Sequence, residues 1–349
     1  MNRQIPAYFI VIILSGYLTY LLVPIVKRYC LKRGLLDYPG PRKIHAVAVP
    51  RLGGVTFIIA FTLALALGFI AAPDLLVENW QGVIGLIGGG IVIFALGVID
   101  DIKAISALPK FVWQVIGALI PVLAGIRPEV INIPYYQVIH LGFWSIPLSV
   151  IWVVVITNTF NLLDGLDGLA AGVGAIASMT FVILSVVLNM PLASLFAAGV
   201  FGVCIGFLRY NYHPAEIFMG DSGSLFIGYV IGVLSLYWPK SYASIVMFVP
   251  LLALGLPVIE IASTAVRRLL TGRRIYVADK RHLFHFLLDQ GFGHKWVVLF
   301  FYFVSFQFSV MAVGFVVGKA NIILVLEIIF IILIAIFLSR KIRSGGRNG

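Results

Sequence analysis

The sequence predicts an all-α integral membrane protein with about eleven transmembrane helices, its amino terminus outside and its carboxyl terminus cytoplasmic. The 349-residue chain is 61% hydrophobic and only 11% charged, whereas soluble domains hold about 45–50% apolar and about 25% charged residues. Long apolar runs follow one another along the whole chain, and the Lys and Arg residues gather between them on one side. This composition excludes an ordinary soluble domain.

A spanning helix needs about 20 apolar residues. Residues 111–126 form a short candidate that Pro121 is expected to kink. The chain shows no convincing repeat and no soluble segment, so we expect a single polytopic domain over residues 1–349. The expected spans are 5–26, 52–72, 81–99, 111–126, 143–160, 169–189, 192–209, 222–238, 243–263, 296–317 and 320–338.

The basic residues predict the orientation. Of the 25 Lys and Arg residues, 21 fall on one side of the expected spans and only Arg3, Arg127, Lys240 and Lys319 on the other. The positive-inside rule makes the first side cytoplasmic. Topology thus explains the net charge of +11 without a nucleic-acid partner, although anionic lipid head groups and nucleotide phosphates stay open as partners. The expected cytoplasmic loops lie near 27–51, 100–110, 158–168, 210–221 and 264–295.

An aspartate pair closes the third expected span in the stretch GVIDDIKAI. Asp100 and Asp101 repel each other at a helix carboxyl end, where the helix dipole is already negative. Lys103, Lys110 or a divalent cation is needed to compensate. A carboxylate whose pKa is raised by such repulsion suits a general base; the alternative is a solvated pair outside the membrane.

Four polar side chains at three-residue intervals end the fifth span, in NTFNLLDGLDGLA. Asn158, Asn161 and Asp164 would spread over about 120° of one helix face. A glycine follows each aspartate and would let the backbone turn Asp167 back toward the same site. A polar turn that caps the next helix is the alternative, but a cap requires only one such residue.

The stretch HPAEIFMGDSGS places Asp221 between two glycines where the eighth span begins. Asp221 could cap the helix or bind Mg²⁺, which takes one or two carboxylates together with substrate phosphates. Because the other acidic clusters lie on the same side of the membrane, we favour the metal.

Two basic segments complete the set. The run RRLLTGRRIYVADKRHLFHFLL includes Arg274, followed by His282 and His285 at helical spacing. These groups suit a diphosphate, although ordinary juxtamembrane charge explains the arginines equally well. The loop PGPRKIHAVAVPRLGG offers Lys43 and the amides of a glycine pair as a weaker phosphate cradle.

Carboxylates, an expected divalent ion and basic groups on one membrane face favour phosphoryl-type transfer between a lipid and a soluble anion such as a nucleotide. A transporter is the alternative from another class. The clustering of carboxylates at one face, instead of at the midplane, and the lack of repeated halves argue against it. A lipid-binding scaffold is a weaker third alternative.

Five ordered motifs, VPRLGG, GVIDD with the lysine of LPKFVWQ, NTFNLLDGLDGLA, HPAEIFMGDSGS and DKRHLFH, carry a family resemblance. The chain resembles the polyprenyl-phosphate N-acetylhexosamine-1-phosphate transferases, and especially the bacterial undecaprenyl-phosphate GlcNAc-1-phosphate transferases that start teichoic acid, O-antigen and related cell-envelope glycans. The resemblance covers nearly the whole chain. It implies transfer from UDP-GlcNAc to undecaprenyl phosphate with Mg²⁺ or Mn²⁺, in the bacterial cytoplasmic membrane. The oligomeric state is open, with a homodimer as one alternative.

The resemblance also implies residue roles. Asp221 matches the main metal ligand and Asn161 a neighbouring group, while Asp100 and Asp101 match the pair assigned to lipid-phosphate activation. Polar positions around the nucleotide, sugar or diphosphate match Lys43, Lys110, Asn158, Asp164, Asp167, His282 and His285. Phe284 replaces the middle histidine of the H-x-H-H pattern of related transferases, and the absence of a histidine run argues against phospho-MurNAc-pentapeptide as the transferred group. Direct displacement and a phosphorylated-aspartate intermediate are both open.

Overall fold

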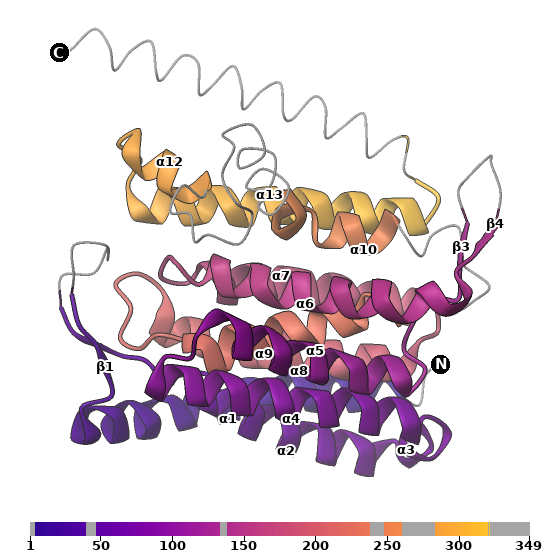
Figure 1. The fold of residues 1–349 in the computed structure, drawn as a ribbon, viewed down its shortest axis with the longest axis horizontal. Helices are drawn as coiled ribbons and strands as arrows, with labels where there is room; N and C mark the ends of the chain where they lie inside the picture. The colour runs from indigo at the N-terminus through magenta and orange to yellow at the C-terminus, as the bar shows by residue number, and fades with distance from the viewer. Residues whose placement is uncertain are drawn as a thin grey trace, which may run out of the picture.

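The computed structural model describes residues 4–39, 47–132, 138–237, 248–259, 283–319 and 321. Figure 1 shows long helices that lie side by side, with their axes along the longest dimension of the molecule. The helices are α1 Ile5–Arg33, α2 Val55–Ala71, α3 Pro73–Glu78, α4 Trp80–Lys103, α5 Ala107–Leu123, α6 Ser145–Leu163, α7 Leu169–Val187, α8 Pro191–Asn211, α9 Gly220–Leu234, α10 Phe248–Ala253, α12 Leu283–Asp289 and α13 His294–Val316.

The prediction of a mostly helical membrane protein is confirmed. Among the described residues, six helical segments are long and apolar enough to cross a membrane, and α2, α5 and α9 are shorter apolar helices. The expected span 243–263 is described only in part, and 320–338 lies outside the described residues apart from Asn321.

Two short antiparallel strand pairs were not expected from the sequence. Strand β1, Leu36–Asp37, pairs with β2, Val49–Pro50, and β3, Val130–Asn132, pairs with β4, Val138–His140. Both pairs lie in connections between helices, at opposite ends of the molecule (Figure 1). They leave the helical architecture unchanged.

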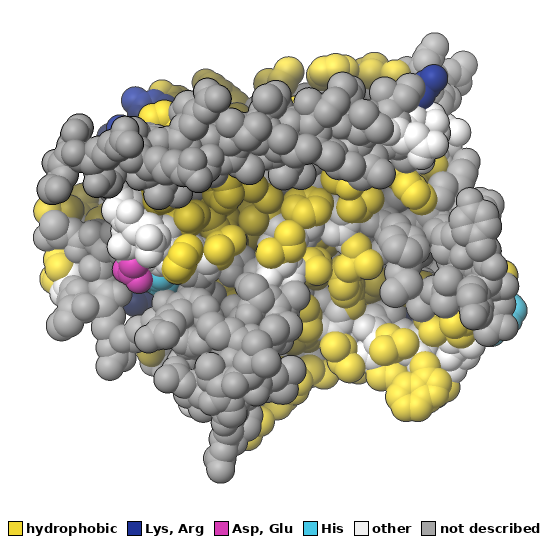
Figure 2. Space-filling view, turned by 90° about the horizontal axis from the view of Figure 1, so that it is seen from above, with side chains coloured by type: hydrophobic (Ala, Val, Ile, Leu, Met, Phe, Trp, Pro, Cys, Tyr) yellow, Lys and Arg dark blue, Asp and Glu magenta, His cyan; other side chains and the backbone are white. Residues whose placement is uncertain are grey.

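Helices α7 and α8 form the centre of the bundle. Within their most apolar 18-residue windows, 72% of α7 and 78% of α8 are buried, compared with 22% of α1. The exposed side chains of α1 and α2 are largely apolar, as in Phe9, Ile13 and Ile70. On the different face seen in Figure 2, the described side chains in view are also mostly hydrophobic, as expected for contact with lipid.

The connections send neighbouring helices in opposite directions. As a result the carboxyl ends of α4, α6 and α8 meet the amino ends of α5, α7 and α9 at the end of the molecule that carries β1 (Figure 1). We call this the β1 end. The motifs GVIDD, NTFNLLDGLDGLA and FMGDSG all fall there, so the topology brings together residues that are more than 100 positions apart.

Two glycines allow the helices to approach closely at this end. A Cβ atom on Gly54 would lie 2.0 Å from the backbone nitrogen of Gly223, and one on Gly97 would lie 2.5 Å from the Cα of Ser222. Any larger side chain would therefore push α2 or α4 away from the start of α9. This close packing sets Asp221 beside the aspartate pair of α4.

Candidate active site

A cavity of about 760 Å³ lies at the β1 end. Segments that are distant in the sequence contribute its walls: the carboxyl end of α4, the α6–α7 turn, the segment before α9, and the starts of α12 and α13. Of the predicted site residues, those that line it are Asp100, Asp101, Asp164, Asp167, Asp221 and His285. The structure therefore confirms that the three acidic motifs share one cavity.

The two members of the aspartate pair have different surroundings. Asp101 is only 7% exposed. Its Oδ1 accepts a hydrogen bond from the backbone nitrogen of Asp221 at 2.9 Å, and its Oδ2 accepts one from Ser222 at 3.0 Å. Because the first amides of a helix have no partner within that helix, Asp101 caps α9 from another element.

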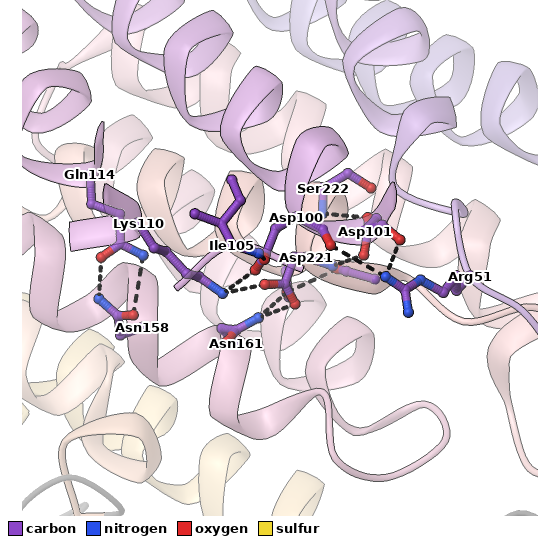
Figure 3. Close-up of polar contacts among 12 residues, drawn as sticks. Arg51, Asp100, Asp101, Ile105, Lys110, Gln114, Asn158, Asn161, Asp221 and Ser222 are labelled. Atoms are coloured by element: carbon purple, nitrogen blue, oxygen red, sulfur yellow. Dashed lines mark hydrogen bonds and ion pairs between the residues drawn. The ribbon is translucent and has the colours of Figure 1, made fainter. Parts of the chain in front are cut away.

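Asp100 faces a second group, which we call the acidic wall: Asp100, Lys110, Asn161 and Asp221. Lys110 Nζ donates to Asp100 Oδ2 at 2.7 Å and also contacts Asp221 Oδ2. Asn161 Nδ2 donates to Asp221 Oδ1 at 2.8 Å. Figure 3 shows these side chains converging, with the ammonium group of Lys110 between the two carboxylates. The expectation that Lys110 compensates Asp100 is confirmed.

Arg51, in the VPRLGG segment, stabilises the end of α4. Its guanidinium donates to the backbone oxygens of Asp100, at 3.3 Å, and of Asp101. Unpaired carbonyls at a helix carboxyl end carry partial negative charge. Arg51 thus offsets the charge that accumulates where two aspartates end a helix.

The glycine pair after Arg51 does not offer its amides to a phosphate. The backbone nitrogen of Gly53 donates to the Phe218 oxygen at 3.0 Å, and that of Gly54 donates to the Met219 oxygen at 2.8 Å. The cradle expected for these amides is therefore wrong. The VPRLGG segment instead holds the FMGDSG segment in place by backbone pairing.

Asp164 lies in the α6–α7 turn, where burial and the negative charges of Asp221, Asp101 and Asp167 raise its pKa well above the usual value for an aspartate. A cation in the cavity would reduce the repulsion between Asp164 and these neighbouring carboxylates and would stabilise its ionised form.

Asn158 does not join the two aspartates of its motif at the cavity. Its Nδ2 donates to Gln114 Oε1 at 2.7 Å, and Gln114 Nε2 donates to Asn158 Oδ1 at 3.1 Å. Figure 3 shows this pair apart from the carboxylates. The prediction that all four polar side chains face one pocket is wrong for Asn158, because a buried glutamine on α5 takes up its amide, and Asn161 contacts Asp221 and Ser224 without lining the cavity.

Asp167 does turn back to the cavity, as expected. Gly168 has a φ of +80°, a left-handed conformation that glycine adopts without a steric cost, and its amide donates to Asn211 Oδ1 at 3.0 Å. Asp167 Oδ2 accepts the Ala215 amide at 3.1 Å and lies 2.7 Å from His213 Nδ1.

His213 and His294 were missed as site residues. Their rings stack with centroids 4.1 Å apart, and both line the cavity beside Asp167. We call Asp167, His213 and His294 the histidine wall. His213 stands inside the motif NYHPAE, so its position before Asp221 was a usable signal. His294 is a single histidine at the first position of α13 and gave none.

Of the remaining predicted basic site residues, the structure describes only His285. His285, on α12, lines the cavity, and burial lowers the pKa of its imidazole while Asp289 opposes that shift. Lys43, Arg274 and His282 lie outside the described residues. Their substrate-binding roles stay predictions.

The acidic wall has the donor set that a hard divalent cation requires. Mg²⁺ prefers oxygen ligands, and Asp100 and Asp221 direct carboxylate oxygens to one point. The chain's own ammonium group occupies that point, which shows that the carboxylates converge on a position suited to positive charge.

Comparison with known proteins places the chain in a family. A family model described as glycosyl transferase family 4 matches residues 83–239. A probable undecaprenyl-phosphate N-acetylglucosaminyl 1-phosphate transferase of Bacillus subtilis (strain 168) is 38% identical over 333 residues, covering 93% of this chain and 89% of the relative.

More distant relatives carry two other names. A decaprenyl-phosphate N-acetylglucosaminephosphotransferase of Mycobacterium tuberculosis (strain ATCC 25618 / H37Rv) is 33% identical, covering 82% of this chain and 77% of the relative. A phospho-N-acetylmuramoyl-pentapeptide-transferase of Moorella thermoacetica (strain ATCC 39073 / JCM 9320) is also 33% identical, covering 83% of this chain and 93% of the relative. The apolar helices of the chain and these matches along most of its length lead to one conclusion: the chain is a membrane-embedded member of glycosyl transferase family 4.

Proposed function

We propose that this protein transfers GlcNAc-1-phosphate from UDP-GlcNAc to undecaprenyl phosphate, giving undecaprenyl-diphospho-GlcNAc and UMP, as the first membrane step of a cell-envelope glycan. The observation that carries the proposal is the acidic wall, in which Lys110 lies between Asp100 and Asp221, two carboxylates that line a large cavity. The named activity of the Bacillus subtilis relative supports the choice of sugar and lipid.

The proposal includes an orientation. We place the β1 end, with the loops near 27–51, 100–110, 158–168, 210–221 and 264–295, on the cytoplasmic side of the bacterial plasma membrane, and we retain about eleven spans in a single domain. Lys27, Lys32 and Arg33 at the carboxyl end of α1 support this choice. The reaction needs no second copy of the chain, and a homodimer stays a prediction.

We further propose that Mg²⁺, with Mn²⁺ as a substitute, binds Asp221 with Asn161 as its neighbour. When bound, the ion would neutralise charge on the donor diphosphate. Asn161 orients the Asp221 carboxylate through the 2.8 Å hydrogen bond. Lys110 would turn from Asp221 toward substrate phosphate, because a divalent ion and an ammonium group compete for the same carboxylate.

The surroundings of the aspartate pair suggest a division of labour. Both oxygens of Asp101 accept backbone amides, so Asp101 holds α9 in place. Asp100 also lines the cavity, where its Oδ1 accepts the Ile105 amide and its Oδ2 accepts Lys110; we assign it the lipid-phosphate proton because its Oδ2 is released when Lys110 turns toward substrate phosphate. The lipid-phosphate oxygen then attacks the β-phosphorus of UDP-GlcNAc, the bond from that phosphorus to the bridging oxygen breaks, and UMP leaves.

A two-step route through a phosphorylated aspartate is the rival mechanism. It predicts exchange of labelled UMP into UDP-GlcNAc in the absence of lipid. Direct displacement predicts that this exchange requires undecaprenyl-diphospho-GlcNAc.

The function can be tested by measuring UMP release from the purified full-length protein with undecaprenyl phosphate and a panel of UDP-sugars, with and without Mg²⁺. We expect UMP release with UDP-GlcNAc that EDTA abolishes and that Asp221→Ala eliminates. Asp74→Asn, an exposed carboxylate on α3 at the other end of the molecule, is the matched control and should retain activity. Release only with UDP-MurNAc-pentapeptide would overturn the sugar assignment, and solute uptake into liposomes without UMP release would favour a transporter.

A further inference from the structure

We propose that the histidine wall binds a transition-metal ion such as Zn²⁺ through one oxygen of Asp167 and one nitrogen each of His213 and His294. This site is distinct from the acidic wall. It rests on the geometry of three side chains and is independent of the proposed transfer reaction.

The three residues already lie close together. One ligand atom from each can be chosen so that all three atoms are within 4.8 Å of one another. Ligand atoms bound to zinc at about 2.0–2.2 Å lie roughly 3–3.5 Å apart. Any pair at the upper limit of this range must therefore shorten by roughly 1.3–1.8 Å, and we assign this movement to side-chain rotation.

Asp167 and His213 form the fixed part of the site. His213 Nδ1 lies 2.7 Å from Asp167 Oδ2, and the amide of Ala215 donates to the same oxygen at 3.1 Å. A metal ion would take the place of the proton that Nδ1 and Oδ2 share, because metal ligands must be deprotonated. The Ala215 amide would continue to orient the carboxylate, as partners of metal ligands commonly do.

His294 is the adaptable part. Its ring lies face to face with that of His213 at an interplanar angle of 18°, and parallel rings do not direct their nitrogen lone pairs at one point. Both ring nitrogens of His294 are buried, and neither makes a hydrogen bond of normal geometry within the described part of the chain. Leaving buried polar atoms unpaired is costly. Rotation of this ring toward a metal would break no hydrogen bond of normal geometry and would satisfy one nitrogen.

The ligand set selects the kind of ion. Two imidazoles and one carboxylate suit zinc and other first-row transition metals, whereas Mg²⁺ favours ligand sets made of oxygen. Three protein ligands leave at least one coordination position for water or for a molecule in the cavity. The cavity would thus hold two cation sites of different chemistry on neighbouring walls.

Cobalt(II) is a suitable probe because its visible absorption reports on nitrogen and oxygen ligands. We expect titration of the purified full-length protein with Co²⁺ to produce an absorption band that Zn²⁺ displaces. His294→Gln and His213→Gln should each weaken binding by at least about tenfold, since each removes one of three ligands. His140→Gln is the matched control, because His140 is exposed on β4 at the opposite end of the molecule.

Asp221→Asn distinguishes the two walls. It should leave the cobalt band in place, whereas a band lost in Asp221→Asn and kept in both histidine variants would overturn the proposal and assign the ion to the acidic wall. Absence of any band in the wild-type protein would overturn it too. Thermal unfolding of each variant shows whether it is folded, and if His213→Gln is not, His294→Gln alone decides.

Discussion

The acidic wall and the histidine wall lie at one cavity, but the negative charge of their carboxylates is balanced by different groups. In the acidic wall, two carboxylates converge on the ammonium group of Lys110. In the histidine wall, one carboxylate faces two stacked imidazoles. The first wall already contains a cation of its own, whereas the second can accept one only by losing a proton. A single cavity can therefore offer two ion sites with different ligand preferences.

The difference follows from where each residue lies on its helix. Asp221 is in the first turn of α9, where negative charge is favoured, whereas Asp100 is near the end of α4, where it is not. Arg51 and Lys110 compensate at α4. His213 lies in the connection before α9 and His294 opens α13, so their placement depends on how these segments pack.

The largest expected effect is the loss of turnover when the acidic wall is changed and the histidine wall is left intact. Asp221→Asn should lower kcat for UMP release by about 10²- to 10³-fold or more, the loss typical when a key electrostatic group is removed from a reaction centre. Its cobalt band at the histidine wall should persist. Near-normal turnover in this variant, measured beside the Asp74→Asn control, would contradict the assignment of the metal to Asp221.

Lys110→Met tests whether the ammonium group competes with Mg²⁺. We expect kcat to fall by about 10²-fold because charge stabilisation of the phosphates is lost. The Mg²⁺ concentration for half-maximal rate should also fall, because the competing cation is gone. Lys110→Arg should restore part of kcat. A raised Mg²⁺ requirement in Lys110→Met would mean that Lys110 supports metal binding instead of competing with it.

Variants of the aspartate pair should separate an effect on stability from an effect on turnover. Asp101→Asn keeps one acceptor and turns an amide N–H toward the start of α9, so it should lower the free energy of unfolding by about 1–3 kcal/mol. Asp100→Asn should lose turnover with a smaller change in stability. Thermal unfolding in detergent, measured with UMP release, separates the two effects; equal destabilisation by both variants would refute the division of labour.

The smallest expected effect is a pH dependence of stability that arises from Asp164 in the α6–α7 turn. Burial and nearby carboxylates raise the pKa of Asp164 in the folded protein. The protonated form is thus favoured, and this carboxyl costs stability increasingly as the pH rises through its raised folded pKa. Metal-free Asp164→Asn should therefore be more stable than wild type at neutral pH, with a gain that shrinks as the pH falls. A melting-temperature difference independent of pH would contradict this.

Much of the fold was predictable because lipid imposes simple demands. Long apolar segments must form helices that satisfy their own backbone groups, and α4, α6, α7 and α8 lie close to their predicted ranges. The strand pair β1–β2 was not predictable, because two-residue strands carry no periodic pattern.

The candidate site was predictable in its members more than in its contacts. The acidic motifs stood out because charges near membrane depth are costly, and Asp164, Asp167 and Asp221 share the cavity. Asn158 was misplaced because its partner, Gln114, is an unremarkable residue on another helix. The same limit hid His294, whose significance depends on a neighbour 81 positions earlier in the chain.

The sequence by itself determined that this is a helical membrane protein with acidic motifs at one end of its spans, because hydropathy and charge are properties of each segment alone. Tertiary structure decided which aspartate caps a helix, which one meets Lys110, and which histidines meet Asp167. The position of the helix cap depends on how closely α2 and α4 approach α9 at Gly54 and Gly97, and the histidine contacts depend on how the segment before α9 and the start of α13 pack beside Asp167. No single segment carries that information.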